Sequence, residues 1–387
     1  MVSANKNWFQ TILTLVILLG ITTLIFLYTS GFRLHRGEED NTVDLARTGM
    51  ISAKSIPEGA SVYLDDELVT ATNDTISGLE PGFHTLKIVK KGYEEWEKEI
   101  EVFEELVTDI TAVLVSQSPM FEPLTNTGAR KPSVSPSLTN LAYFSSDEQT
   151  PGVWVIPINQ GGLNLFRANP SVVLEDTRVN RYSDGNSITW SPTEKQLLVE
   201  TNDQFFYLVG LETNTAQSVT NPEEIIENWQ NVLKKEREDF VSKLEISEEI
   251  AKLAVSEDVL WSPDEKKFLY KEQVGDQLIY KVYNMEKPLP VGEKVETTVF
   301  TTNVNDPQPN ITWYSDSFHL ILTEGNIIEE NQGTISLIRI DGTNKVEIYG
   351  GSIHSPKVYS VPTGDKVIVI TSLKSGAQTD LYTVGIR

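Results

Sequence analysis

The first strong pattern along the chain is an apolar run near the N-terminus. No charged residue occurs between Lys6 and Arg33, and Ile12–Tyr28 reads ILTLVILLGITTLIFLY. About 20 apolar residues in a helix cross the hydrocarbon core of a bilayer. Trp8 and Tyr28 lie near the two ends of this run, where aromatic side chains favour the membrane interface. The pattern predicts a transmembrane helix over residues 8–30, preceded by a short cytoplasmic tail, residues 1–7.

A cleaved signal peptide is the alternative for this run. The run is long for a signal peptide, and no small-x-small cleavage site follows it. We therefore expect an uncleaved signal anchor. The positive charges on its two sides are nearly balanced, with Lys6 and the terminal amine against Arg33 and Arg36. Orientation is thus not decided by charge alone.

After the apolar run, the pattern changes to short alternating segments. Residues 31–47 are polar, without an evident period, and are expected to be a linker. Residues 48–116 alternate apolar and polar positions between turn residues, which predicts about five to six short strands. Trp96, Ile100 and Val102 should share one strand face, and Ile110, Ala112 and Leu114 another.

Three ordered motifs in residues 48–116 resemble the PEGA domain. Pro57-Glu58-Gly59-Ala60 is the motif that gives the family its name, and Val62-Tyr63-Leu64-Asp65 follows it in the place of the family's strand and turn. Gly78-Leu79-Glu80-Pro81-Gly82 and Lys91-Gly92-Tyr93 match two further turns. Asp66-Glu67 departs from the family, which usually has a glycine at this hairpin. The resemblance implies a non-catalytic β-sandwich of surface and envelope proteins. A generic spacer is the equally weighted alternative.

From residue 117 onward one pattern recurs five times. Each copy has a Pro or Ser, four mostly polar residues and an apolar triplet, as in Pro263-Asp-Glu-Lys-Lys-Phe268-Leu269-Tyr270. The copies begin at residues 136, 192, 263, 315 and 362. Strand-rich repeats with a period of roughly 40–50 residues are typical of propeller blades. The pattern predicts a β-propeller of about five blades over residues 117–387.

Each marker is followed by a second apolar strand, and usually by one more. The last copy lacks a final strand, whereas Met120-Phe121-Glu122-Pro123-Leu124 precedes the first marker unpaired. We expect this segment to supply the missing outer strand beside Tyr382, because closure removes free sheet edges. Trp190, Trp261 and Trp313 stand at the same repeat position, two residues before the marker, which favours a packing role.

The stretch Trp261-Ser262-Pro263-Asp264 resembles the TolB-like β-propeller repeat, although Glu265 replaces the usual glycine. The resemblance covers residues 117–387. It implies the fold but little about function, because propellers serve unrelated tasks. A PEGA-like domain and a TolB-like propeller behind one anchor also look like a class of bacterial envelope proteins. That likeness favours an extracytoplasmic C-terminal part.

A helical insertion is expected at residues 222–254. Asn221 and Pro222 form an N-cap and first-turn pair, and Ser247 begins a second helical run. Ile225, Trp229, Val232/Leu233, Phe240 and Leu244 fall at helical spacing. We expect this apolar stripe to pack on the propeller rim. A partner-docking helix is the alternative.

Composition excludes several classes of protein. Lys and Arg total 32 against 55 Asp and Glu, a formal charge of −23. Nucleic acid and anionic lipid surfaces need clustered cations, so neither is an expected partner. The absence of cysteine removes disulfides, thiol catalysis and thiolate metal sites.

Candidate catalytic and metal-binding motifs are weak. Gly350-Gly351-Ser352-Ile353-His354 lacks the last glycine of a nucleophile elbow. The four histidines are scattered, and the acidic turn Asp65-Asp66-Glu67 has no EF-hand spacing. His84 and His319 fall in expected strands. No catalytic, cofactor-binding or metal-binding residue is assigned, and no cofactor and no enzymatic activity are expected.

The sequence therefore predicts a mainly β, single-pass protein of the cell membrane with an extracytoplasmic C-terminal part. Its expected function is binding or scaffolding in the envelope through a surface of the propeller. The expected partners are the lipid bilayer, through one helix, and an envelope protein or cell-wall polysaccharide. The alternative is a cell-wall or surface glycan-binding module. Trp96 and Trp229 are the tryptophans outside core-like positions that such a module would use.

Overall fold

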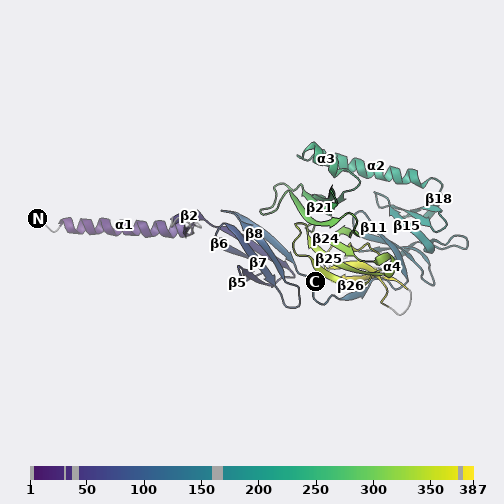
Figure 1. Cartoon of the computed structure of the whole chain (residues 1–387), viewed down its shortest axis with the longest axis horizontal. Coiled ribbons are helices and arrows are strands. Elements are labelled where there is room, and N and C mark those ends of the chain that lie inside the picture. Colours follow the sequence, from purple (N-terminus) through teal and green to yellow (C-terminus); the bar gives the residue numbers. More distant parts are fainter. Residues whose placement is uncertain (1–3, 30–31, 37–42, 159–168, 374–377) are drawn as a thin grey trace. The chain divides into compact units, whose positions relative to one another are not determined.

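A computed structural model describes residues 4–29, 32–36, 43–158, 169–373 and 378–387. The chain forms two compact units (Figure 1). One comprises residues 1–91, 95–114 and 290–293, and the other residues 92–94, 115–289 and 294–387. The two units are described in turn.

The N-terminal apolar run forms one helix, α1 (Ala4–Thr29). Its segment Trp8–Leu27 is long and apolar enough to cross a membrane. The hydroxyls of Thr14 and Thr22 donate to the carbonyls of Gln10 and Leu18, at 2.7 and 2.8 Å. These bonds satisfy polar side chains inside the apolar run, as an apolar environment requires.

The expected linker contains regular structure, which corrects the prediction for residues 31–47. β1 (Phe32–Arg36) pairs with β2 (Val43–Arg47) as two antiparallel strands, with Leu34 opposite Leu45. Apolar and polar residues alternate through much of both segments, which is the period of a strand. The charged residues in both strands make this alternation difficult to recognise in the sequence.

The rest of the first unit consists of two sheets. One has the order β5-β4-β7-β8 and the other β6-β3-β9. The strands are β3 (Gly49–Ile56), β4 (Ser61–Leu64), β5 (Glu67–Ala71), β6 (Asp74–Leu79), β7 (Gly82–Val89), β8 (Trp96–Val102) and β9 (Val107–Val113). That is seven strands where five to six were expected. Trp96, Ile100 and Val102 lie buried on one face of β8, as predicted, and Ile110 and Ala112 on one face of β9.

The hairpin between β4 and β5 turns without the glycine that is usual in the PEGA domain. Asp65 and Asp66 both adopt positive φ, 50° and 66°. A tight turn of this hand needs left-handed backbone at both central residues, and Asp tolerates it better than most side chains. The Asp65 carboxylate also accepts hydrogen bonds from the Thr85 amide (2.9 Å) and from Nδ1 of His84 (2.7 Å). These bonds hold the turn against β7.

The second unit contains five four-stranded antiparallel sheets, one for each sequence repeat. The first is β11 (Ala129–Val134), β12 (Asn140–Ser145), β13 (Gly152–Pro157) and β14 (Ser171–Glu175). The second is β15 (Gly185–Trp190), β16 (Gln196–Thr201), β17 (Phe206–Gly210) and β18 (Thr215–Val219), preceded by the 3-10 turn η1 (Tyr182–Asp184). The mainly β fold class with a five-bladed propeller is confirmed.

The remaining sheets follow the same order of strands. The third is β19 (Leu260–Trp261), β20 (Lys267–Val274), β21 (Gln277–Asn284) and β22 (Glu296–Asn303). The fourth is β23 (Asn310–Trp313), β24 (His319–Glu324), β25 (Gln332–Arg339) and β26 (Val346–Ser352), with the single-turn helix α4 (Ile327–Glu330) between its middle strands. The fifth is β27 (Tyr359–Ser360), β28 (Lys366–Thr371), β29 (Asp380–Gly385) and β10 (Phe121–Pro123).

The predicted closure of the fifth sheet is confirmed. β10 comes from the N-terminal side of the repeats and pairs with β29, with Phe121 opposite Val384 and Pro123 opposite Tyr382. The buried carboxylate of Asp380 reinforces this pairing. It accepts hydrogen bonds from the Thr125 hydroxyl (3.0 Å) and from the Gly128 amide (3.0 Å), both just beyond β10.

Neighbouring sheets pack through apolar faces. Leu141 and Tyr143 of the first sheet pack against Ile370 and Leu381 of the fifth. The opposite face of the first sheet packs on the second, and the third packs on the fourth. Each of these interfaces removes apolar surface from water, which is the main stabilising term for such stacked sheets.

Two of the three repeated tryptophans, for which the sequence predicted a packing role, connect neighbouring sheets. Nε1 of Trp190 donates to the carbonyl of Ser133 in the preceding sheet (2.9 Å). Nε1 of Trp313 donates in the same way to Leu260 (2.8 Å). Trp261 differs, because its Nε1 donates to Ala254 of the insertion (2.9 Å).

The insertion forms α2 (Pro222–Val241) and α3 (Glu248–Ala254), which Figure 1 shows beside β21. Its C-terminal half, including Phe240, Val241 and Leu244, packs on the face of the third sheet that bears Phe268. Only part of the apolar stripe therefore packs on the propeller, and it packs on the face of one blade. Val232 and Leu233, in the middle of α2, remain exposed.

Candidate functional site: the loop face of the propeller

The two ends of the propeller strands differ in what their connections do. The turns between the first and second strands of each sheet lie at one end, which we call the turn face. Neighbouring turns bond to one another there: the Ser137 hydroxyl donates to Glu194 (2.9 Å), and the Asp264 amide to the Ser317 hydroxyl (3.1 Å). Much of the polar capacity of the turn face is therefore used to hold sheets together.

The opposite end carries a second set of connections, including the helical insertion, and we call it the loop face. Because strands alternate in direction, it collects the loops between second and third strands and the links between sheets. These segments are 124–128, 146–151, 176–184, 202–205, 275–276 with the adjoining end of β20 at Val274, 304–309, 325–331, 353–358 and the described residues of 372–379. The insertion also joins the sheets from this end. In propellers and similar scaffolds, such loops are common binding surfaces.

Five large apolar side chains on the loop face are more than half exposed: Val179, Phe205, Val274, Ile328 and Leu373. Val179 and Ile328 are 89% and 88% exposed. In the rest of this unit, within the described residues, Met120 is the one large apolar side chain exposed to that degree. Single exposed apolar residues are ordinary, but their concentration at one end of a fold marks an interaction surface.

The loop face is also acidic. Outside the insertion, its described segments carry three basic residues, Arg178, Arg181 and Lys357. They carry nine acidic residues: Asp147, Glu148, Asp176, Asp184, Asp203, Asp276, Asp306, Glu329 and Glu330. The resulting negative potential favours a cationic partner and opposes anionic lipid or nucleic acid.

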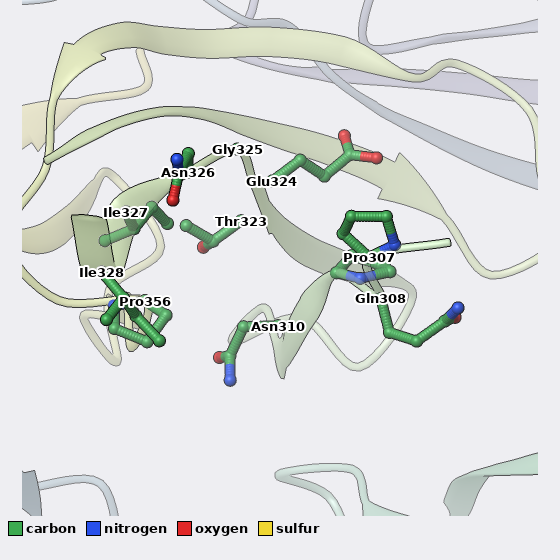
Figure 2. Close-up of a pocket in the computed structure, with 11 residues that line it drawn as sticks. Pro307, Gln308, Asn310, Thr323, Glu324, Gly325, Asn326, Ile327, Ile328 and Pro356 are labelled. Atoms are coloured by element: carbon green, nitrogen blue, oxygen red, sulfur yellow. The ribbon is translucent and has the colours of Figure 1, made fainter. Parts of the chain in front are cut away.

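A cavity of about 310 Å³ opens on this face around β24 (Figure 2). Its walls come from residues 307–310 and 323–328 and from Pro356. Thr323 and Glu324 are neighbours on β24 and point in different directions in Figure 2. Glu324 pairs with Lys345 (2.8 Å), and the side chains of Thr323 and Asn326 supply polar lining near Ile327. The cavity is a small, mixed polar and apolar recess.

Two local features fix the cavity walls. The Gln308 side-chain oxygen accepts hydrogen bonds from Tyr280 (2.8 Å) and Thr302 (2.6 Å), which anchors the link between the third and fourth sheets. Gly325 has a φ of 120°, and a Cβ there would lie 2.8 Å from the carbonyl oxygen of Gln332. A glycine is therefore required where the chain leaves β24. The one-turn helix α4 then presents Ile328 at the rim.

Ser352 and His354 lie close together at the end of β26. The Ser352 hydroxyl is 3.3 Å from Nε2 of His354, and burial lowers the pKa of this histidine. No carboxylate among the described residues bonds to the other ring nitrogen. A nucleophilic triad needs such an orienting group, so the pair does not form one.

The structure also places the other residues considered in the sequence. Trp96 is buried in the core of the first unit and Trp229 is half-buried on α2, so neither lies on a loop of the loop face. His84 is engaged by Asp65, and Nδ1 of His319 is 2.7 Å from Asp316. Within the described residues, no three His, Asp or Glu side chains are grouped as a metal site. Trp154, on β13, was not singled out because no motif marks its position.

Comparison with known proteins bears on two predictions, the PEGA resemblance of the first unit and the propeller fold of the second. The PEGA domain family matches residues 48–118, which confirms the resemblance drawn from the motifs. No curated protein sequence matches the chain. The fold and the matched domain thus define a protein with an N-terminal apolar helix, a PEGA domain over residues 48–118 and a β-propeller.

Solved structures with similarity to the chain include propeller proteins. TolB from Acinetobacter baumannii is 11% identical with a TM-score of 0.27, and the alignment covers 78% of this chain and 60% of that one. This chain thus spans under two thirds of that structure's length. The putative TolB from Agrobacterium tumefaciens is 16% identical with a TM-score of 0.24, covering 68% and 74%. The oligogalacturonate lyase of Vibrio parahaemolyticus is 8% identical with a TM-score of 0.27, covering 70% and 97%.

One expectation from the sequence is wrong on these comparisons, namely that the chain is not an enzyme. The similar structures include enzymes, among them the lyase just described and an acylaminoacyl peptidase from Pyrococcus horikoshii. The peptidase is 11% identical with a TM-score of 0.23, covering 67% of this chain and 39% of that one. The sequence argument failed because it searched for known catalytic motifs, and a propeller fold is compatible with catalysis.

Proposed function

We propose that this protein is a membrane-anchored, extracytoplasmic binding or scaffold protein of the cell envelope, whose loop face docks a partner protein. The observation that carries the proposal is the concentration of exposed apolar side chains on one end of the propeller. They stand on loops that a rigid stack of sheets holds in place. Binding surfaces are commonly built in this way.

Two features of the first unit support this location of the propeller in the cell. α1 serves as an uncleaved anchor, because its apolar run is long and lacks a cleavage signal. The PEGA domain follows it and belongs to a family expected in surface and envelope proteins. Because this domain lies between the anchor and the propeller in sequence, we infer that the propeller lies on the outer side of the membrane.

The chemistry of the loop face restricts the partner. Exposed apolar side chains such as Ile328 and Phe205 would enter apolar recesses of the partner. The carboxylates around them would pair with Lys or Arg of the partner at the rim of the interface. A basic protein surface with apolar recesses fits both features. The alternative of a glycan-binding module loses the two tryptophans first considered for it, since Trp96 is buried and Trp229 is half-buried on α2.

Site-specific photocrosslinking of the full chain in its native membrane tests the docking face. A photoreactive residue at Ile328 or Val179 should give a discrete adduct with the same partner. The matched control is Val295, which is about half exposed (48%) at the other end of the third sheet. Adduct from position 295 but from neither loop-face position would refute the proposal. A second substitution, Phe205→Asp, should abolish the adduct at 328.

Protease access to intact spheroplasts tests the orientation. An extracytoplasmic propeller is cleaved from outside without lysis of the cell. Protection of the propeller until lysis would place it in the cytoplasm and overturn the envelope assignment, whatever the crosslinking result.

A further inference from the structure

A second cavity lies within the propeller unit, away from the loop-face cavity, where the fifth sheet meets the first. It has a volume of about 620 Å³, twice that of the loop-face cavity. It is bounded by β10 with the residues just after it, by β13, and by the turn 361–366. We call it the seam groove.

The seam groove is bordered by the short closing strand. β10 has three residues, whereas the outer strands of the other four sheets have five to eight. The strand ends at Pro123, and the amides of Leu124 and Thr125 then both donate to the carbonyl of Leu381 (2.8 and 3.2 Å). The half-buried Trp154 of β13 lines the groove opposite this segment.

Trp154 is held in a fixed orientation. Its Nε1 donates to the carbonyl of Thr150 (3.0 Å), and its ring packs at the edge of the apolar cluster that joins the first and fifth sheets. Its ring also lines the groove. The seam groove thus contains a preorganised aromatic surface, which costs a ligand little ordering entropy.

The polar lining is rich in uncommitted amide groups. Asn126 and Asn169 are exposed and line the groove, and neither side chain makes a hydrogen bond with the described residues. Each amide offers two donors and one acceptor oxygen. Asp365, beside them, accepts from the Thr363 hydroxyl and keeps further acceptor capacity.

The charges of the groove nearly cancel. Lys366 pairs with Glu122 across the seam, which leaves Asp365 as the remaining charged side chain in the lining. A groove of this charge does not attract phosphate, uronate or nucleic acid. A peptide that adds a strand would also be poorly matched, because Pro123 cannot donate from the edge of β10.

We propose that the seam groove binds a neutral oligosaccharide chain. A sugar ring has an apolar face of C–H groups and a rim of hydroxyls. Trp154 would take the apolar face, while Asn126, Asn169 and Asp365 would exchange hydrogen bonds with the hydroxyls. The groove shares residues 124–127 with the loop face, but none of the five exposed apolar side chains of that face lines it, so the failure of either proposal leaves the other standing.

Binding of neutral hexasaccharides to the full chain in nanodiscs tests this proposal. The probes are cellohexaose, maltohexaose and chitohexaose, with hexagalacturonate as the charged comparison, measured by saturation-transfer NMR and calorimetry. We expect saturable binding of at least one neutral probe and weaker or no binding of the acidic one. Asn126→Ala and Asn169→Ala should each weaken binding about tenfold, the effect of losing roughly 1.4 kcal/mol of hydrogen bonding.

The control variant is Asn305→Ala, which removes an exposed amide on the loop face and should leave sugar affinity unchanged. Trp154→Phe keeps an aromatic ring in the cluster and should weaken binding with little loss of stability. The proposal is overturned if no neutral probe binds at millimolar concentration, if the acidic probe binds best, or if binding is indifferent to both asparagine variants.

Discussion

The closure of the fifth sheet depends on one buried carboxylate, and its removal should open the propeller at the seam. Asp380 is 1% exposed. Its oxygens accept from Thr125 (3.0 Å), the Gly128 amide (3.0 Å) and the Gln378 amide (2.8 Å). The first two donors lie more than 250 residues away in sequence, directly after β10. The substitution Asp380→Ala therefore removes the contacts that fasten β10 to the last repeat.

The expected cost follows from these three bonds. Hydrogen bonds to a charged group contribute about 1.5–3 kcal/mol each. The contributions do not add fully, because Thr125 and Gln378 can turn toward other partners, whereas the Gly128 amide stays buried and unpaired. We expect a loss of about 3–5 kcal/mol for Asp380→Ala. Asp380→Asn keeps an acceptor oxygen, so its cost should be about 1–2 kcal/mol.

Native-state hydrogen exchange on the full chain measures this cost locally. The amides of residues 121–128 should lose about 10²–10³-fold of their protection in Asp380→Ala, since 1.4 kcal/mol corresponds to tenfold. Amides of β24, in the fourth sheet, should change far less. Asp203→Ala, at an exposed loop position, is the matched control. If residues 121–128 kept their protection in Asp380→Ala, the carboxylate would not hold the closure and the reasoning would be refuted.

Three further predictions concern single side chains. Lys267 has no exposed side-chain area and its Nζ lies 3.2 Å from Asp264 and 3.4 Å from Glu286, so Lys267→Ala should destabilise the propeller by about 2–4 kcal/mol. The adjacent Lys266→Ala should change the free energy of unfolding by less than about 0.5 kcal/mol by denaturant titration, because Lys266 is half exposed. Burial alone would lower the pKa of His84, but the hydrogen bond to Asp65 raises it above the usual histidine value of about 6.5. The stabilisation from this pair is therefore complete below pH 6.5 and is lost as pH rises through the raised pKa. An NMR titration of the His84 ring should show a pKa that falls in Asp65→Asn, and an unchanged value would contradict the pairing. Gly325→Ala should strain the backbone where the chain leaves β24 by about 1–3 kcal/mol and raise amide hydrogen exchange in residues 325–331. Gly275→Ala is the control, because φ is positive there too but a Cβ meets nothing within 4 Å. Equal effects of the two glycine substitutions would show that the contact with Gln332 does not matter.

The sequence alone determined features that depend on local patterns. The apolar run of α1, the PEGA motifs and the five repeat markers each follow from spacing within a short segment. The closing strand was also predictable, because a repeat that lacks one strand and an unpaired segment at the other end imply each other. Tandem repeats make such inferences reliable, since each sheet repeats the same pairing.

Features that depend on which surfaces meet required the tertiary structure. No sequence motif indicates that Trp154 borders a groove, because the other walls of the groove come from distant segments such as the turn 361–366. The exposure of Ile328 and Val179 on one common face likewise follows from the direction of strands in separate sheets. Trp261 shares its motif with Trp190 and Trp313, yet it bonds to the insertion. Sequence motifs determine the local backbone conformation. The packing of distant segments determines which group a side chain contacts, and it also determines which surfaces remain uncovered for binding.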